Sequence, residues 1–124
     1  AAMAMYAKEQ TRAVGIRFLL DQLRSTTDPN LIESIQRHLD ELVHADRSER
    51  LNNALAEYLE RFPQSPVSIA SLVTAQILEK IPEDPYGEGW VLDVTGMIYS
   101  QREADLRIQR EINFERSMLQ TLGL

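Results

Sequence analysis

Apolar residues in the first half of the chain recur every three or four positions, which is the spacing of one face of an α-helix. The first such run predicts a helix over about residues 3–23, and the polar stretch 25–27 ends it. Asp28-Pro29 then predicts a second helix, because Asp caps an N-terminus and Pro suits the first helical position. Between Leu31 and Val43 the apolar residues fall on one clean face of this helix.

The segment Asp46-Arg47-Ser48-Glu49 fits a capping box, in which an N-cap side chain and a Glu three residues later satisfy free N–H groups. We expect a third helix to begin here and to end before Pro63. A single helix over residues 29–62 is the alternative, because no helix-breaking residue lies between Val43 and Arg47.

The segment 65–89 joins a short amphipathic run to a turn-rich loop. Ser65-Pro66 predicts the start of a fourth helix, whose apolar residues include Ile69, Leu72, Val73, Ile77 and Leu78. Pro82 and Pro85 exclude helix from the loop that follows, and its two glycines permit sharp turns.

Two β-prone runs, 90–92 and 97–99, flank the sequence Asp93-Val94-Thr95-Gly96. Gly at the last of these positions suits a type I turn with a bulge, so the pattern predicts a two-stranded β-hairpin. Because a lone hairpin is at best marginally stable in water, we expect it to pack on the helices. Trp90 then lies largely buried beneath the hairpin and orders the loop before it.

Ser100-Gln101-Arg102-Glu103 is a second capping box and predicts a last helix, which Gly123 ends. We expect this helix to be a docking element, because its apolar arc is wider than one groove usually covers. Leu106, Phe114 and Leu122 either pack within the chain on the helices before Pro63, or form a homodimer with Arg and Glu at its rim.

The expected fold is therefore mainly α, with about five helices and one small two-stranded β-hairpin. At 124 residues the chain is long enough for one modest core, so we predict a single domain, 1–124. Within it we expect a helical hairpin region (1–63), a region with a helix, the loop and the β-hairpin (65–100), and a C-terminal helix (101–124).

Composition excludes some classes of function. The net charge of −6 argues against nucleic-acid binding, because phosphate neutralisation needs clustered Lys and Arg. The absence of cysteine excludes disulfides, thiolate metal sites and Cys nucleophiles. No apolar run reaches the length of a membrane span, and no signal peptide is visible, so we expect membrane attachment only through an anchor upstream of this segment.

About a third of the chain, between residues 62 and 100, resembles the post-helix segment of type II secretion major pseudopilins, and a similar element occurs in helical envelope proteins of proteobacteria. The residues on which the resemblance rests are Phe62-Pro63, Leu72-Val73, Ile81-Pro82, Asp84-Pro85-Tyr86-Gly87, Trp90, Asp93, Gly96 and Ser100. The chain departs from pseudopilins in having no long apolar N-terminal helix, and it has a predicted helix where their calcium loop lies. The resemblance therefore implies a helical envelope protein that shares the motif.

The run 51–66 also resembles the second helix of a tetratricopeptide repeat with its terminal proline. No second copy appears at a period of about 34 residues, which a repeat architecture requires. An ordinary helical hairpin explains the same residues, and we favour it.

Candidate chemistry is sparse. His38 and His44 lack the spacing of a zinc pair, and we interpret both as surface or helix-end histidines. The acids Glu83, Asp84, Glu88 and Asp93 could gather oxygens for calcium, although turn and capping roles explain them as well. No nucleophile elbow is present, and neither histidine adjoins a glycine turn, so we expect no enzyme, no cofactor and no bound metal.

The sequence thus predicts a non-enzymatic interaction or scaffold module that binds a protein partner or a second copy. The resemblance places it in the periplasm or cell envelope, near a bacterial secretion or pilus assembly, with the cytoplasm as the alternative compartment. The alternative function is a small ligand- or calcium-binding sensor that uses the Asp84–Trp90 loop. The residues expected to matter are Asp84, Pro85, Tyr86, Gly87, Trp90, Leu106, Phe114 and Leu122.

Overall fold

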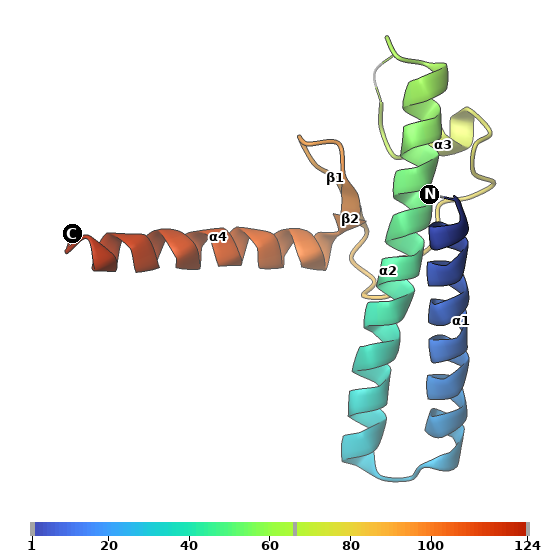
Figure 1. Ribbon diagram of the computed structural model, residues 1–124, viewed down its shortest axis with the longest axis vertical. Helices are drawn as coiled ribbons and strands as arrows, with labels where there is room; N and C mark the ends of the chain where they lie inside the picture. The colour runs from blue at the N-terminus through green and yellow to red at the C-terminus, as the bar shows by residue number, and fades with distance from the viewer. Residues whose placement is uncertain (1, 66, 124) are drawn as a thin grey trace.

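The computed structural model describes residues 2–65 and 67–123, and for residues 2–9 it describes the backbone alone. Within these residues four helices and two strands follow one another (Figure 1): α1 (Ala2–Ser25), α2 (Pro29–Arg61), α3 (Ser71–Thr74), β1 (Trp90–Leu92), β2 (Ile98–Ser100) and α4 (Gln101–Thr121). The predicted fold class, mainly α with one two-stranded antiparallel β-hairpin, is confirmed. The described helices number four, where about five were expected.

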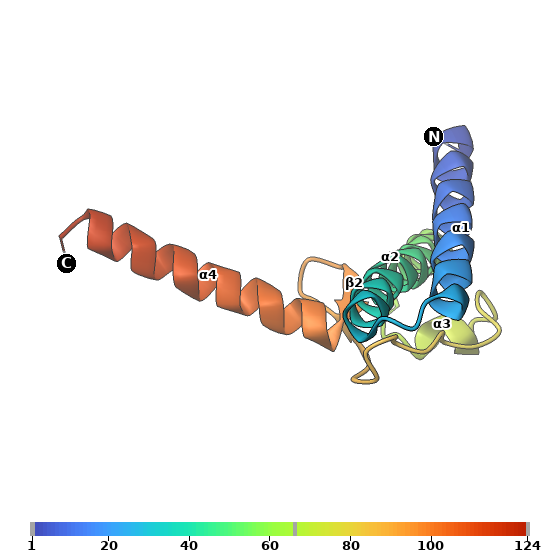
Figure 2. The ribbon, with the colours of Figure 1, turned by 90° about the horizontal axis from the view of Figure 1, so that it is seen from below.

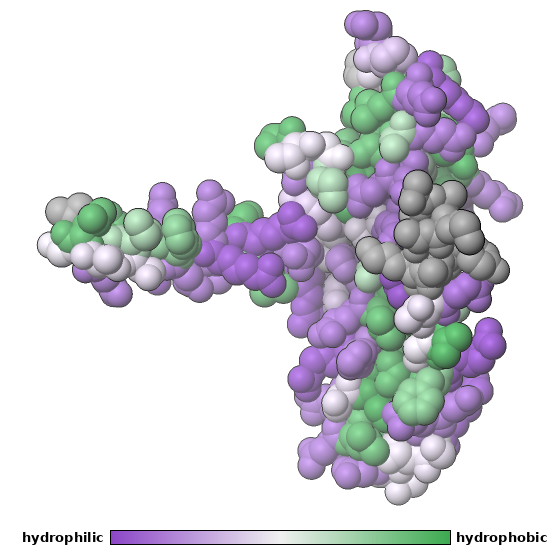
Figure 3. All heavy atoms as spheres, viewed as in Figure 1, coloured by the Kyte–Doolittle hydropathy of each residue, from purple (hydrophilic) through white to green (hydrophobic). Residues whose placement is uncertain are grey.

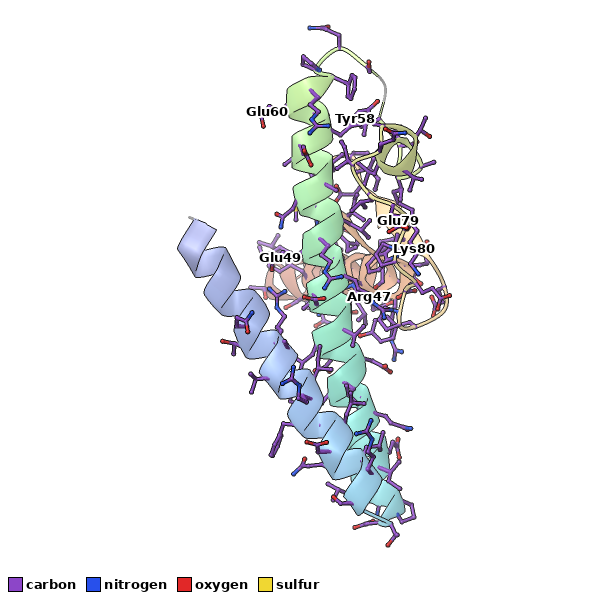
Figure 4. The ribbon with its side chains drawn as sticks, turned by 90° about the vertical axis from the view of Figure 1, so that its right-hand side faces the viewer. Arg47, Glu49, Tyr58, Glu60, Glu79 and Lys80 are labelled. Atoms are coloured by element: carbon purple, nitrogen blue, oxygen red, sulfur yellow. The ribbon has the colours of Figure 1, made fainter. Side chains whose placement is uncertain are left out.

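Helices α1 and α2 lie side by side as an antiparallel helical hairpin, and they diverge toward the N-terminus (Figure 4). The predicted start of α2 is confirmed, because the Asp28 carboxylate accepts a hydrogen bond from the Asn30 N–H at 3.0 Å. Arg12 of α1 joins the helices through ion pairs with Asp46, at 3.6 Å, and Glu49. The lower half of the molecule in Figure 1 is formed by these two helices.

The predicted break before Asp46 is wrong, because α2 runs uninterrupted from Pro29 to Arg61. The residues that suggested a capping box make tertiary contacts instead. Asp46 and Glu49 face Arg12 of α1, and the Ser48 hydroxyl donates to the Ile98 carbonyl at 2.8 Å. Capping-box residues inside a helix can therefore serve packing between elements.

The core lies where the second half of α2 meets α3 and the β-hairpin. Its buried members are Leu51, Ala54, Leu55 and Tyr58 of α2, Leu72 of α3 and Ile98 of β2. Partly buried apolar residues of the loop between α3 and β1 pack against this cluster. Hydrophobic burial here is what fixes an irregular segment of the chain against a helix.

The predicted fourth helix is much shorter than expected. Only Ser71–Thr74 is helical, and the proposed cap residue Pro66 lies outside the described residues. Gln76 adopts a left-handed conformation, with φ of 60°, which ends the helix. The N–H groups of Ile77 and Leu78 then both donate to the Leu72 carbonyl, so the chain curls and the two side chains pack on the core.

The predicted β-hairpin is present. β1 and β2 pair antiparallel, with Trp90 opposite Ser100 and Leu92 opposite Ile98. The turn between them closes through a hydrogen bond from the Asp93 N–H to the Met97 carbonyl at 2.9 Å. Gly96 has a φ of 85°, a conformation that glycine adopts without strain.

Helix α4 begins and ends where the sequence predicts. The Ser100 hydroxyl accepts from the Glu103 N–H at 3.1 Å, and Gly123 follows the helix with a φ of 75°. The helix projects sideways from the rest of the molecule and contacts it at its N-terminal end (Figures 1 and 2). None of the residues Gln101–Thr121 is buried, so of the two alternatives for this helix, the one in which Leu106, Phe114 and Leu122 are buried on the helices before Pro63 is wrong.

Candidate functional site

Three polar side chains of α2 bind the outer edge of β2. His44, Ser48 and Asn52 are spaced by four residues and so lie along one face of the helix. Asn52 pairs with the backbone of Ile98, donating to its carbonyl at 2.8 Å and accepting from its N–H at 2.7 Å. His44 Nε2 accepts from the N–H of Ser100 at 3.2 Å. The inner edge of β2 pairs with β1, so α2 takes the place of a third strand.

Through β2, these three side chains fix the N-terminal end of α4, which we call its root. β2 ends at Ser100, and α4 begins at the next residue. The Gln101 N–H also donates to the Gly89 carbonyl at 2.9 Å, which ties the first turn of α4 to the loop before β1. The sequence suggested Ser48 only as part of a capping box, and it gave no indication of the role of Asn52.

Asp84 organises the loop that the sequence singled out. Its carboxylate accepts backbone N–H bonds from Tyr86 at 3.1 Å, from Glu88 at 3.0 Å and from Gly89 at 3.0 Å. Gly87 has a φ of 75°, so the Asp-Pro-Tyr-Gly order reflects a specific turn in which Pro85 is partly buried. Both carboxylate oxygens of Asp84 therefore serve the loop itself, which favours a structural role over calcium binding.

Trp90 links the loop to the start of the hairpin. Its indole N–H donates to the Pro82 carbonyl at 2.7 Å, and its ring packs in part against the core cluster. From the opposite side of the loop, the Arg47 guanidinium donates to the Glu83 carbonyl at 2.6 Å. Figure 4 shows Arg47 and Glu49 leaving α2 on opposite sides, toward the loop and toward α1.

His44 lies at the centre of an aromatic cluster rather than at a surface or helix end, so that interpretation of it was wrong. Its ring stacks on Trp90, with centroids 5.7 Å apart and planes 17° apart, and it lies 5.7 Å from the Tyr86 ring. Burial lowers the pKa of His44, with Arg107 acting in the same sense and Glu103 and Asp84 opposing it. The neutral imidazole is the form that accepts from Ser100. His38, by contrast, is exposed.

An open cleft of about 580 Å³ lies between α2 and α4. Its α2 wall includes Asp40 and Glu41, and its α4 wall includes Arg102, Leu106 and Arg110. Arg102 sits over the Tyr86 ring, 4.7 Å from its centroid. Both walls are polar, and Leu106 belongs to this cleft rather than to the far side of the helix.

The three apolar residues of α4 that the sequence grouped do not share a face. At about 100° per residue, Leu106 and Leu122 are about 160° apart around the helix axis, with Phe114 between them. A stripe on one face is instead formed by Ile108, Ile112, Leu119 and Leu122, whose exposed fractions are 56, 38, 49 and 66%, with Glu115 between Ile112 and Leu119. We call these four residues the α4 stripe. Figure 3 shows polar side chains at the root of α4 and apolar ones gathering toward its far end.

Other chemistry has little support in the described structure. Within the ranges 2–65 and 67–123, no three His, Asp or Glu side chains are grouped so that they could hold a metal ion.

The Asp93 carboxylate accepts from Thr95, from the Met97 N–H and from the Tyr99 hydroxyl, and these bonds hold its pKa far below the usual range. In the described part of the chain no helix has the length and apolar character that a membrane span requires.

Comparisons with protein-family models, with curated proteins and with solved structures find no match to this chain. Inferences about function therefore rest on the geometry of the described residues and on the sequence.

Proposed function

We propose that this chain is a non-enzymatic protein-interaction module that presents α4 to a helical partner. One observation above all supports the proposal. Over its 21 residues α4 buries no side chain, yet it displays the α4 stripe together with Met118, which is 46% exposed. Apolar residues gathered on one exposed face of a helix mark a surface that contacts something else.

The root of α4 supports this reading, because it is built to hold the helix in place. β2 is hydrogen-bonded to the side chains of His44, Ser48 and Asn52, and its last residue, Ser100, caps α4. A helix joined through several hydrogen bonds and an aromatic cluster is presented to a partner in one orientation. Presentation in one orientation reduces the entropy lost on binding.

The absence of catalysis is also part of the proposal. His44, the better-placed histidine, uses Nε2 to accept from a backbone N–H and so is not free to act as a general base. The proposed setting is the periplasmic side of a bacterial membrane, in or near a secretion or pilus assembly. That setting rests only on the resemblance of residues between 62 and 100 to pseudopilins.

Photo-crosslinking in the cells that produce this chain tests the proposal. The photoreactive amino acid p-benzoylphenylalanine would replace Leu119, in the stripe, or Ser117, which lies about 160° away around the axis. We expect a discrete crosslinked protein band from position 119 and little from position 117. No band from position 119, or bands of equal strength from both positions, would contradict a docking role for the stripe.

A further inference from the structure

The α4 stripe has the spacing of a coiled-coil seam. Ile108, Ile112, Glu115, Leu119 and Leu122 follow one another at intervals of four, three, four and three residues. This alternation is that of a and d positions in a heptad repeat, with Ile112 and Leu119 at a and the other three at d. Two helices that share such a seam pack side by side.

The charges beside the seam indicate which helix fits. Glu111 precedes an a position and Arg116 follows a d position, so they occupy g and e. In a parallel coiled coil, residue g of one helix faces residue e of the partner, five positions further on. Glu111 of one copy therefore faces Arg116 of a second copy, and symmetry repeats this ion pair on the other side.

Both of these charges are available to a partner in the described structure. Glu103, nearer the root, pairs with Arg107 at 3.3 Å and Arg110 at 3.6 Å. Among the described residues, neither Glu111 nor Arg116 has an ion pair or a side-chain hydrogen bond. Glu103, near the N-terminal end of α4, thus forms ion pairs within the chain, whereas Glu111 and Arg116, beside the seam, can form ion pairs with a partner.

We propose that the partner of α4 is a second copy of this chain, joined to it through a parallel two-helix coiled coil. This inference rests on the proposed function and names its partner. The interface is isologous, with the same stripe on both copies. An antiparallel pair fits less well, because the same seam would place Glu111 beside Met118 and Arg116 beside Gln109, leaving both charges unpaired.

Glu115 lies at the centre of the seam, where two copies bring their carboxylates together. This acid weakens the dimer and keeps association reversible, as polar residues at a or d positions do. Glu115→Leu should therefore tighten the dimer at least tenfold. Ser117→Leu adds the same side chain on the opposite face of α4 and should leave the dissociation constant unchanged.

Sedimentation velocity over a concentration series, with charge-exchanged variants, is the test. Glu111→Lys and Arg116→Glu each turn two attractive pairs into repulsive ones, and each should weaken the dimer by roughly tenfold. An equimolar mixture of the two variants restores opposite charges at both sites, so it should form a heterodimer as tight as the wild-type dimer.

Several outcomes would overturn the proposal. A mixture that stays as weak as its components rules out the parallel arrangement. Wild-type and Glu115→Leu chains that both remain monomeric at high micromolar concentration rule out the second copy. If position 119 then crosslinks to a different protein, the docking role of α4 stands and only the identity of the partner is wrong.

Discussion

Removing the side-chain amide of Asn52 should destabilise the fold more than any other single polar change on α2. In Asn52→Ala the Ile98 N–H loses its acceptor, at 2.7 Å, and the Ile98 carbonyl loses one of its two donors. Ile98 is fully buried, so its N–H is shielded from water in the intact fold. An unsatisfied buried donor costs about 1–3 kcal/mol and a lost hydrogen bond about 1 kcal/mol, which gives about 2–4 kcal/mol in total.

Two matched variants set the scale for that loss. Ser48→Ala removes the other donor to the Ile98 carbonyl, which keeps its bond to Asn52, so it should cost about 1 kcal/mol. Asn53→Ala removes the same amide from the next position, where the side chain is exposed, and should change stability by less than about 0.5 kcal/mol. The expected order of destabilisation is therefore Asn52, then Ser48, then Asn53.

Urea denaturation measures all three losses. Far-ultraviolet circular dichroism follows the helices and the fluorescence of Trp90 follows the hairpin. One protein concentration is used throughout, because the proposed dimerisation would alter the apparent stability. Coincident transitions with a lower midpoint and an unchanged slope are expected for Asn52→Ala. A loss of less than about 0.5 kcal/mol for this variant would refute the idea that α2 replaces a third strand.

Three further predictions concern the rest of the site. Burial lowers the pKa of His44 below its value in the unfolded chain, so the contribution of His44 to stability is complete above about pH 6.5 and is lost as pH falls through the lowered value. The drop in the urea midpoint between pH 7.5 and pH 5.5 should therefore be smaller in His44→Gln than in the wild type or in the exposed control His38→Gln. Trp90→Phe should cost about 1 kcal/mol for the lost bond to Pro82, and Trp90→Ala about 3 kcal/mol by urea denaturation, whereas no loss in Trp90→Phe would mean that the indole N–H is unimportant. Esterase, phosphatase and nucleotidase screens of the purified chain should stay at background, and turnover that disappears in the His44 variant would contradict this.

Local sequence signals predicted the parts of the fold that local geometry determines. The turn between β1 and β2 needs a residue with positive φ, and Gly96 supplies it. The start of α4 needs a side chain that accepts from the backbone, and Ser100 is that residue. In both places the residues that form the turn or the cap are also the residues from which it was predicted.

Predictions failed where a residue serves a distant element. Ser48 and Asp46 suggested a helix start, but their partners are Ile98 and Arg12, which lie far away in the sequence. Gln76 adopts a left-handed conformation that nothing in its side chain favours. There the burial of apolar neighbours on the core outweighs the local preference of the backbone.

The candidate site was found only in part for the same reason. The loop from Asp84 to Gly87 was visible because Pro and Gly mark turns within a few residues. His44 and Asn52 act on β2 across 56 and 46 residues of sequence, and no spacing rule connects a helix face to a strand that distant. For α4, the helical periodicity of the sequence was enough to identify the α4 stripe. Leu106 and Leu122 were grouped without regard to their angular separation around the helix axis.

The contacts between α2 and β2 have an evolutionary consequence. Asn52 recognises the backbone of Ile98, and His44 recognises that of Ser100, so neither contact depends on which side chain the strand bears. The attachment itself therefore does not restrict the side chains of β2; Ile98 is restricted by the core, and Ser100 by its cap of α4. Divergent members of this lineage should keep the polar triplet His44, Ser48 and Asn52, spaced by four residues, and mutational tolerance should be low along this line of α2.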